Sequence, residues 1–146
     1  MDVRSDRRYE FAVETGELWR ALIRTEDYQD WWPWLRVFEA TSFSPGQRWV
    51  CVVQPPLPYT VRFGLVLGQV VEGRLVTASV DGDIVGDARL DITPTTGGSE
   101  LRLVSRLAPS NTLLRTVARI ARPLAVFGHD WVLDTGLRQF SSRALP

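Results

Sequence analysis

Apolar and polar residues alternate along most of the chain between residues 36 and 107, which is the period of strands with one buried and one solvated face. The clearest case is the segment 59–71, in which Tyr59, Val61, Phe63 and Leu65 share one face. Turn signals such as Asp81-Gly82-Asp83 separate these segments. We expect strands at residues 7–14, 36–43, 47–54, 59–71, 74–80, 84–93 and 99–107.

The segment between the first two strands has helical periodicity instead. Residues 16–24 carry an apolar stripe at helical spacing, and Thr15 is a suitable N-cap. Thr25 can start a second short helix, which ends near Trp32 because Pro33 disfavours helical geometry in the residue before it. Two short helices are therefore predicted here.

The C-terminal part predicts one long helix over residues 111–143, with Ser110 as its N-cap. Its expected apolar face before the proline consists of Leu113, Leu114, Val117, Ile120, Ala121 and Leu124. The polar stripe then rotates, and after Pro123 it runs through Asp130, Asp134 and Arg138. We expect Pro123 to kink this helix.

Together these elements predict an α+β helix-grip fold, in which a curved antiparallel sheet of about seven strands packs against one long helix. The length of 146 residues fits a single domain spanning 1–146. A helix of about 30 residues is ~45 Å long and covers a wide sheet incompletely. We therefore expect a cavity between the helix and the sheet.

The charge balance limits the classes of partner. The chain has 17 basic and 17 acidic residues, and its net charge is zero, which argues against nucleic acid and against a polybasic membrane anchor. Every basic residue is arginine, so a Schiff-base lysine mechanism is excluded. The sequence leaves open whether the chain forms a homodimer.

Cysteine and hydropathy patterns indicate a cytoplasmic protein. Cys51 is the only cysteine, so no internal disulfide can form, and no metal-ligand or cofactor-binding spacing stands out. The segment Met1 to Glu10 lacks the apolar core of a signal peptide. The longest apolar stretch, 61–71, is interrupted by Arg62 and Gln69, so we expect no stable membrane insertion.

Three segments make the chain resemble the SRPBCC superfamily, which includes START domains, Bet v 1-like proteins and small bacterial polyketide cyclase/dehydrase-like proteins. They are FAVETGELWRALIRTEDYQDWWP near the N-terminus, DGDIVGDARLDITPTTGGSELRLVSRL in the strand region, and ARPLAVFGHDWVLDTGLRQF in the last helix. The resemblance covers residues 7–143 and is closest to the small bacterial cyclase-type members. It implies a seven-stranded sheet that grips the C-terminal helix over a hydrophobic pocket.

The aromatic segment from Tyr28 to Trp34 supports two interpretations. Its indoles can pack the short helices onto the sheet, or Trp31 and Trp34 can line the mouth of the pocket, where a large apolar surface with one N–H donor suits a planar ligand. The two interpretations can hold for different residues.

A second candidate set lies on the apolar faces of the strands. The residues Trp49, Tyr59, Phe63, Leu90 and Leu103 are either ordinary core or, in a helix-grip fold, walls of the pocket. Ser105 lies in the same phase and can orient a ligand through its hydroxyl.

His129 is the only histidine, and it shares a helix face with Ala125, Val132 and Leu133. It is either a buried core residue with hydrogen-bond partners or a polar contact or general acid/base on the floor of the pocket. Gly128, on the same helix, costs about 1 kcal/mol relative to alanine there. Close approach of the sheet or space for a ligand would explain that cost.

Three functions fit these residues. The first is binding of a small hydrophobic molecule that is polyketide-, sterol-, quinone- or lipid-like. The second is a polyketide cyclase or dehydratase that uses the same cavity, with His129 and either Asp130 or Tyr59 as acid/base groups. The third is an interaction domain with a collapsed pocket. Because few polar groups converge, no catalytic set is assigned.

Overall fold

The computed structural model describes residues 2–145, apart from the side chain of Leu124, and it contains one seven-stranded antiparallel sheet. The strands are β1 (Val3–Phe11), β2 (Leu35–Glu39), β3 (Arg48–Val53), β4 (Val61–Val71), β5 (Leu75–Gly82), β6 (Ile84–Thr95) and β7 (Gly98–Pro109). Their spatial order is β1-β7-β6-β5-β4-β3-β2. The predicted α+β helix-grip class is confirmed.

All seven strands were expected, but β1 begins four residues before the predicted segment 7–14. Its inward positions include Ser5 and Arg7, which pair in register with Ser105 and Leu103 of β7. Two polar residues on the inner face hide the apolar alternation by which a strand is recognised. Pairing with β7, which is visible only in the fold, is what makes this segment a strand.

Two short helical segments follow β1, as predicted. Helix α1 (Thr15–Leu22) is followed by the 3-10 turn η1 (Thr25–Asp27) and by α2 (Tyr28–Trp31). Thr15 is the first helical residue and not the cap, because the extended residue before the helix is Glu14, whose side chain makes no capping hydrogen bond.

The C-terminal helix is divided in two, so the prediction of one kinked helix over 111–143 was wrong. Helix α3 (Thr112–Ile120) ends at Ala121, whose φ of −135° and ψ of 59° are not helical, and α4 (Arg122–Ala144) begins directly after it. Pro123 lies in the first turn of α4. A proline lacks the N–H that a helix interior needs but is tolerated in a first turn, so the helix restarts there.

The N-cap of α3 is also one residue later than expected. The Asn111 side-chain oxygen accepts a hydrogen bond from the Leu114 N–H at 2.7 Å, which is the capping geometry. The predicted cap, Ser110, instead donates its hydroxyl to the Gly82 carbonyl. Leu124, which was expected on the apolar face, lies outside the described side chains.

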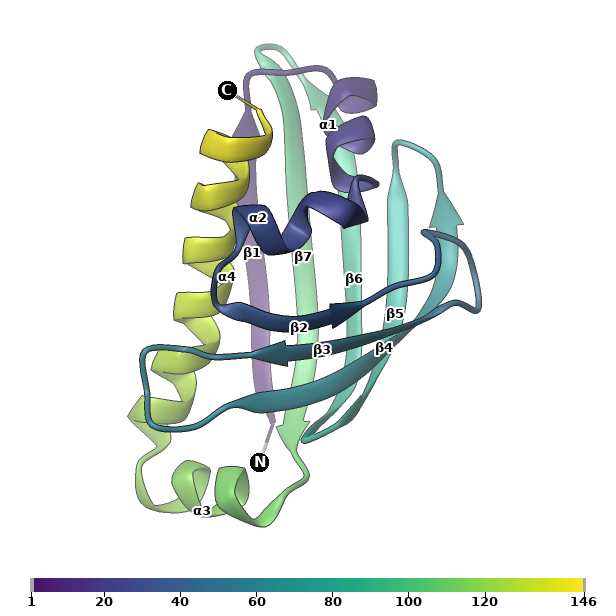
Figure 1. Ribbon diagram of the computed structural model, residues 1–146. Helices are drawn as coiled ribbons and strands as arrows, with labels where there is room; N and C mark the ends of the chain where they lie inside the picture. Colours follow the sequence, from purple (N-terminus) through teal and green to yellow (C-terminus); the bar gives the residue numbers. More distant parts are fainter. Residues whose placement is uncertain (1, 146) are drawn as a thin grey trace.

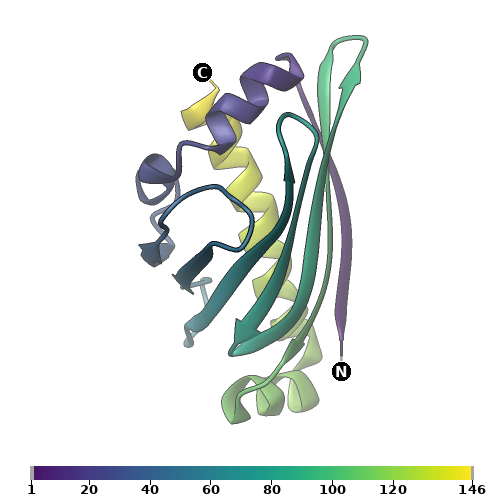
Figure 2. The same cartoon turned by 90° about the vertical axis from the view of Figure 1, so that its right-hand side faces the viewer.

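Helix α4 has 23 residues and is about 35 Å long, and the sheet curls around it (Figure 1). Figure 2 shows that α1, α2 and α4 lie on the same, concave side of the sheet. None of the helices among residues 2–145 is long and apolar enough to cross a membrane.

The densest core lies between the sheet and the C-terminal half of α4. Phe140 is only 1% exposed, and its ring meets Phe11 of β1 edge-on at 5.8 Å and Trp31 of α2 at 5.4 Å. Leu18 of α1 and Leu101 of β7 are buried in the same cluster. One helix position thus joins the sheet edge to the short helices.

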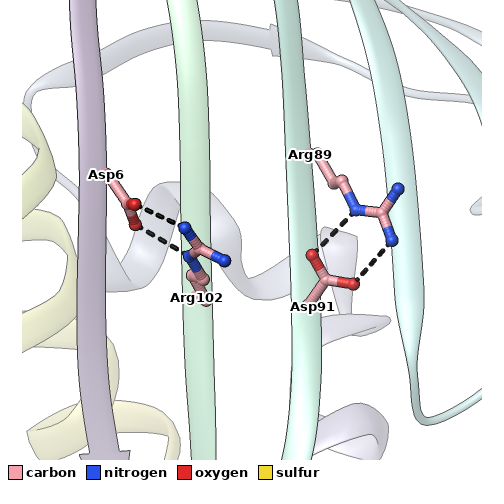
Figure 3. A network of polar contacts seen from close by, with 4 residues as sticks. All are labelled: Asp6, Arg89, Asp91 and Arg102. Carbon is pink, nitrogen blue, oxygen red and sulfur yellow. Dashed lines mark hydrogen bonds and ion pairs between the residues drawn. The ribbon is translucent and has the colours of Figure 1, made fainter.

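The convex face is polar and carries paired charges. Arg102 of β7 donates two hydrogen bonds to Asp6 of β1, and Arg89 donates two to Asp91 within β6 (Figure 3). Because the face is solvated, such pairs contribute little to stability, but they keep the face soluble.

Replacement of Phe140 tests whether this residue joins the layers. We expect Phe140→Ala to lower the free energy of unfolding by about 3–5 kcal/mol, because it leaves a cavity in the packed core. The matched control is Phe127→Ala on the same helix, where the ring is 48% exposed and we expect a loss below about 1 kcal/mol. Urea unfolding followed by circular dichroism measures both variants. Equal losses would show that the core is not centred on Phe140.

Candidate ligand-binding cavity

A cavity of about 240 Å³, partly open to solvent, lies between the sheet and the N-terminal half of α4. Its lining is almost entirely apolar and comes from all strands except β2, from the loop after β3, and from α3 and α4. The lining residues are Val3, Val53, Pro55, Tyr59, Val61, Phe63, Leu65, Val80, Ile84, Ala88, Leu103, Ser105, Leu107, Ala108, Pro109, Leu114, Ala118, Ala125, Gly128, His129, Val132 and Leu133.

The C-terminal half of α4 is held close to the aromatic segment after α2. The Trp32 indole N–H donates to the Gly136 carbonyl at 2.9 Å, and the Trp34 indole N–H donates to the Gln139 side-chain oxygen at 2.8 Å. A Cβ on Gly136 would lie 3.1 Å from the Trp34 ring, so glycine permits this close approach. The indoles therefore fix one half of the helix.

The N-terminal half of α4 forms one wall of the cavity, and two of its lining residues, Ala125 and Gly128, are small. Ala125, Gly128 and Val132 face the cavity at helical spacing. A Cβ on Gly128 would lie 2.8 Å from the Tyr59 hydroxyl oxygen, so this glycine makes room for Tyr59. The cost of a glycine within the helix is explained by this approach.

Five of the nine candidate residues line the cavity together: Tyr59, Phe63, Leu103, Ser105 and His129. The other four, Trp31, Trp34, Trp49 and Leu90, are not among its lining residues. Whether the five contact a ligand stays a prediction.

The tryptophans of this set are structural in this arrangement. Trp31 is 5% exposed and lies under the Arg24 guanidinium, whose carbon is 5.3 Å from the ring centroid. Trp49 is equally buried, and its indole N–H donates to the Ser42 carbonyl at 3.0 Å. Trp34 packs on α4, and Leu90 packs against the main core. Core residues and cavity residues both lie on the inward-facing side of the strands, so the alternation along a strand does not distinguish them.

Several walls of the cavity, including Ala88, Ala125, Val132 and Leu133, were not named as site candidates. The available signal for the last three was the helix face that they share with His129 and Gly128. Small residues on a helix face indicate either close packing or space, and Gly128 shows both.

Ser105 is the one cavity residue with a buried, unpartnered side-chain oxygen among residues 2–145. The residue is 7% exposed, and its hydroxyl oxygen has no hydrogen-bond partner. Its register partner on β1 is Ser5, whose hydroxyl oxygen is also buried and unpartnered. An unmade hydrogen bond in an apolar site is costly, which makes Ser105 a suitable anchor for a polar atom of a ligand.

Two more polar groups border the cavity. Burial raises the pKa of the Tyr59 phenol, so this group stays protonated and can donate a hydrogen bond. The His129 side chain is 17% exposed, and its Nδ1 lies 3.3 Å from the Asp130 carboxylate. His129 is therefore partly buried, in line with its apolar helix face.

The two aspartates of α4 do not line the cavity and instead contact β1. Asp130 pairs with Arg7 at 2.9 Å, and Asp134 accepts a hydrogen bond from the Tyr9 hydroxyl at 3.2 Å. Desolvation and the neighbouring Asp134 raise the pKa of Tyr9 to about 12. No Asp, Glu or Arg belongs to the described lining, and residues 2–145 hold no cluster of three metal-ligating side chains.

Two serines of β7 give a matched test of the unpartnered hydroxyl. Ser99 is fully buried and donates to the Val13 carbonyl at 2.9 Å, whereas Ser105 has no partner. We expect Ser99→Ala to lower stability by about 1–3 kcal/mol and Ser105→Ala to leave it unchanged or raise it, because only Ser99→Ala leaves a buried carbonyl without its donor. Thermal unfolding compares the two variants. An equal loss would mean that the Ser105 hydroxyl is already satisfied.

The chain resembles known proteins in its fold but not in its sequence. No protein-family model matches the chain, and no curated protein matches its sequence. Solved structures match it closely in shape. TTHA0849 from Thermus thermophilus matches with a TM-score of 0.74 at 14% identity, over 99% of this chain and 97% of that one. The allergen structure Ara h 8.0201 matches with a TM-score of 0.71 at 10% identity, over 99% of both chains.

Two further matches are proteins whose names indicate biosynthetic roles. The di-domain aromatase/cyclase BexL from the BE-7585A biosynthetic pathway matches with a TM-score of 0.76 at 9% identity, over 99% of this chain and 50% of that one. Norcoclaurine synthase from Thalictrum flavum, solved with dopamine and hydroxybenzaldehyde, matches with a TM-score of 0.69 at 13% identity, over 99% of this chain and 87% of that one. At these identities the likeness concerns the fold alone: this chain has the helix-grip fold of the SRPBCC, or Bet v 1-like, proteins.

Proposed function

We propose that the protein binds a small, uncharged, hydrophobic molecule in the cavity between the sheet and α4. The observation that carries this proposal is the chemistry of the lining, which is apolar and contains one buried hydroxyl without a partner, that of Ser105. A concave apolar site with a few polar groups is the usual form of a small-molecule site.

The volume of the cavity narrows the size of the ligand. An apolar protein cavity of about 150 Å³ holds one benzene molecule. In proportion, about 240 Å³ suits a molecule of roughly two fused rings. Because the cavity is partly open, a longer ligand such as a quinone or lipid can extend into solvent. Of the ligand types considered, a polyketide- or quinone-like ring system fits the enclosed part best.

The charge of the lining narrows the chemistry further. A carboxylate or ammonium group buried here would find no opposite charge among the described lining residues, and burial of an unpaired charge is very costly. A hydroxyl or carbonyl group needs only a hydrogen bond, which Ser105, Tyr59 or His129 can supply. We therefore infer a neutral ligand with one or two oxygen atoms.

Binding of 2-naphthol tests this proposal by isothermal titration calorimetry. Because no tryptophan lines the cavity, heat is a better readout than indole fluorescence. We expect one site per chain, and we expect Ala125→Phe to weaken binding by at least about tenfold by filling the cavity. The control is Val126→Phe, at the next position of the same helix, which does not line the cavity.

A charged ligand of the same shape provides the second comparison. At neutral pH 2-naphthoate carries a carboxylate, and we expect it to bind at least about tenfold more weakly than 2-naphthol. Equal affinity for both compounds, or equal weakening by both phenylalanine variants, would place binding outside this cavity. The proposal would then be wrong.

A cyclase- or dehydratase-like enzyme that uses the same cavity is the second candidate. It is favoured by one observation, the contact between His129 Nδ1 and the Asp130 carboxylate, because a carboxylate beside an imidazole orients the ring for proton transfer. Asp130 is held in turn by Arg7. In this function the other imidazole nitrogen exchanges a proton with the substrate, and the apolar walls position a reactive chain.

Substitution of His129 distinguishes the two candidates. Glutamine retains hydrogen bonding but cannot act as an acid or base near neutral pH. If the protein is a binder, His129→Gln changes 2-naphthol affinity by less than about fivefold. If it is an enzyme, the variant retains binding and loses at least ~100-fold in turnover of an aromatic polyketide-type substrate. Retention of turnover by His129→Gln would exclude the acid/base role.

A further inference from the structure

Helix α3 carries apolar side chains both on the face that packs against the protein and on a face exposed to solvent. Leu114 and Ala118 are buried against the body of the protein and line the cavity. Leu113 and Ile120, seven residues apart and so on one face, are 56% and 80% exposed. Phe127, in the second turn of α4, is 48% exposed. Scattered exposed apolar residues are ordinary, but two large ones on one face of a nine-residue helix, with a third in the helix that follows, need a reason.

The same corner carries three exposed arginines although the whole chain is neutral. Arg115, Arg119 and Arg122 are exposed, and the sequence contains no acidic residue from Asn111 to His129. None of the three arginines forms an ion pair with an acidic side chain within the described part of the chain. In contrast, arginines of the sheet such as Arg48 and Arg102 are paired with aspartates.

This surface lies at one end of the molecule, and it borders the cavity. Figures 1 and 2 both show α3 beyond the ends of the strands, on the opposite end from α1 and the C-terminus. A shallow hollow between Pro109, Ala118 and the three arginines lies on this end. A flat partner can therefore reach the corner without meeting the rest of the protein.

We propose that the α3 corner, defined as Leu113, Arg115, Arg119, Ile120, Arg122 and Phe127, docks on the surface of an anionic lipid membrane. The apolar side chains would enter the boundary between headgroups and acyl chains, while the guanidinium groups bind lipid phosphates. Exposed leucine, isoleucine and phenylalanine next to arginine is the composition of an interfacial helix. Docking of this kind is peripheral and requires no membrane-spanning helix.

Charge complementarity favours a membrane over a second copy of the chain. In a two-fold dimer the same patch meets itself, so the arginines of one copy would face those of the other with no acidic residue in the segment to balance them. A nucleic acid would satisfy the arginines but would leave the three apolar side chains in water. An anionic bilayer offers partners to both.

Sedimentation of the full chain with vesicles tests the proposal. We expect binding to vesicles of equal parts phosphatidylglycerol and phosphatidylcholine to exceed binding to pure phosphatidylcholine vesicles by at least about tenfold, and to weaken as salt is raised. Equal binding to both kinds of vesicle, or no binding to either, would overturn the proposal.

Two variants separate the apolar and cationic contributions. Leu113→Gln with Ile120→Gln should reduce binding to the anionic vesicles at least ~10-fold, and so should the triple variant Arg115→Gln, Arg119→Gln, Arg122→Gln. The control is Arg20→Gln, Arg36→Gln, Arg74→Gln, which changes the net charge equally at exposed arginines elsewhere. We expect this control to bind as the parent chain does.

The controls keep the test independent of folding and of ligand binding. Far-UV circular dichroism and 2-naphthol titration show whether each variant keeps its fold and its cavity. Equal loss of binding in both arginine triples would indicate a net-charge effect and would contradict a docking site. If the parent is a dimer that the Leu113/Ile120 variant converts to a monomer, the corner is a protein interface and the proposal is wrong.

Discussion

The structure depends on how one helix covers a sheet that is wider than itself. Helix α4 is clamped at its C-terminal half, where Phe140 meets Phe11 and Trp31 and the indoles of Trp32 and Trp34 bond to the helix. These contacts hold the C-terminal half of the helix against the aromatic segment and β1. Over the N-terminal half, residues that include Ala125 and Gly128 face the cavity. Because protein interiors are normally close-packed, a cavity of this size is a distinct feature of that half.

The two halves of α4 contribute differently to the stability of the fold. The aromatic half buries large rings, and Phe140 is among the most deeply buried side chains of the core. The cavity half forgoes such burial and keeps the Ser105 hydroxyl oxygen without a partner. A bound neutral molecule would bury the walls, satisfy this oxygen and stabilise the folded state in proportion to its concentration. Ligand binding and folding are therefore expected to be linked in this protein.

The fold was predictable because its signals are local. Alternation in segments such as 59–71 fixes the strands, and Pro33 marks the end of the second short helix. The break at Ala121 was missed because a proline pattern alone does not distinguish a kink from a restart. The start of β1 was missed because Ser5 and Arg7 occupy inner positions. For β1, the pairing with β7 decides the local structure.

The site was predictable only in part. Phe63, Leu103 and Ser105, which face inward, line the cavity, whereas Trp49 and Leu90 face inward as well and lie in the core. The two groups differ in their position along the strands relative to the fixed C-terminal half of α4. The sequence of the strands does not show where that helix lies. The net charge was also an incomplete guide to the partners of the chain. A neutral total conceals the difference between the paired arginines of the sheet and the arginines at α3, which form no ion pair within the described residues.

The central claim is that the cavity under the N-terminal half of α4 receives a neutral ligand. Intermolecular nuclear Overhauser effects between 2-naphthol and labelled methyl groups test it most directly. The account predicts contacts with the methyls of Leu103, Val132 and Leu133, which line the cavity. Contacts confined to exposed methyls such as those of Ile23 and Val71, with none in the cavity, would contradict it.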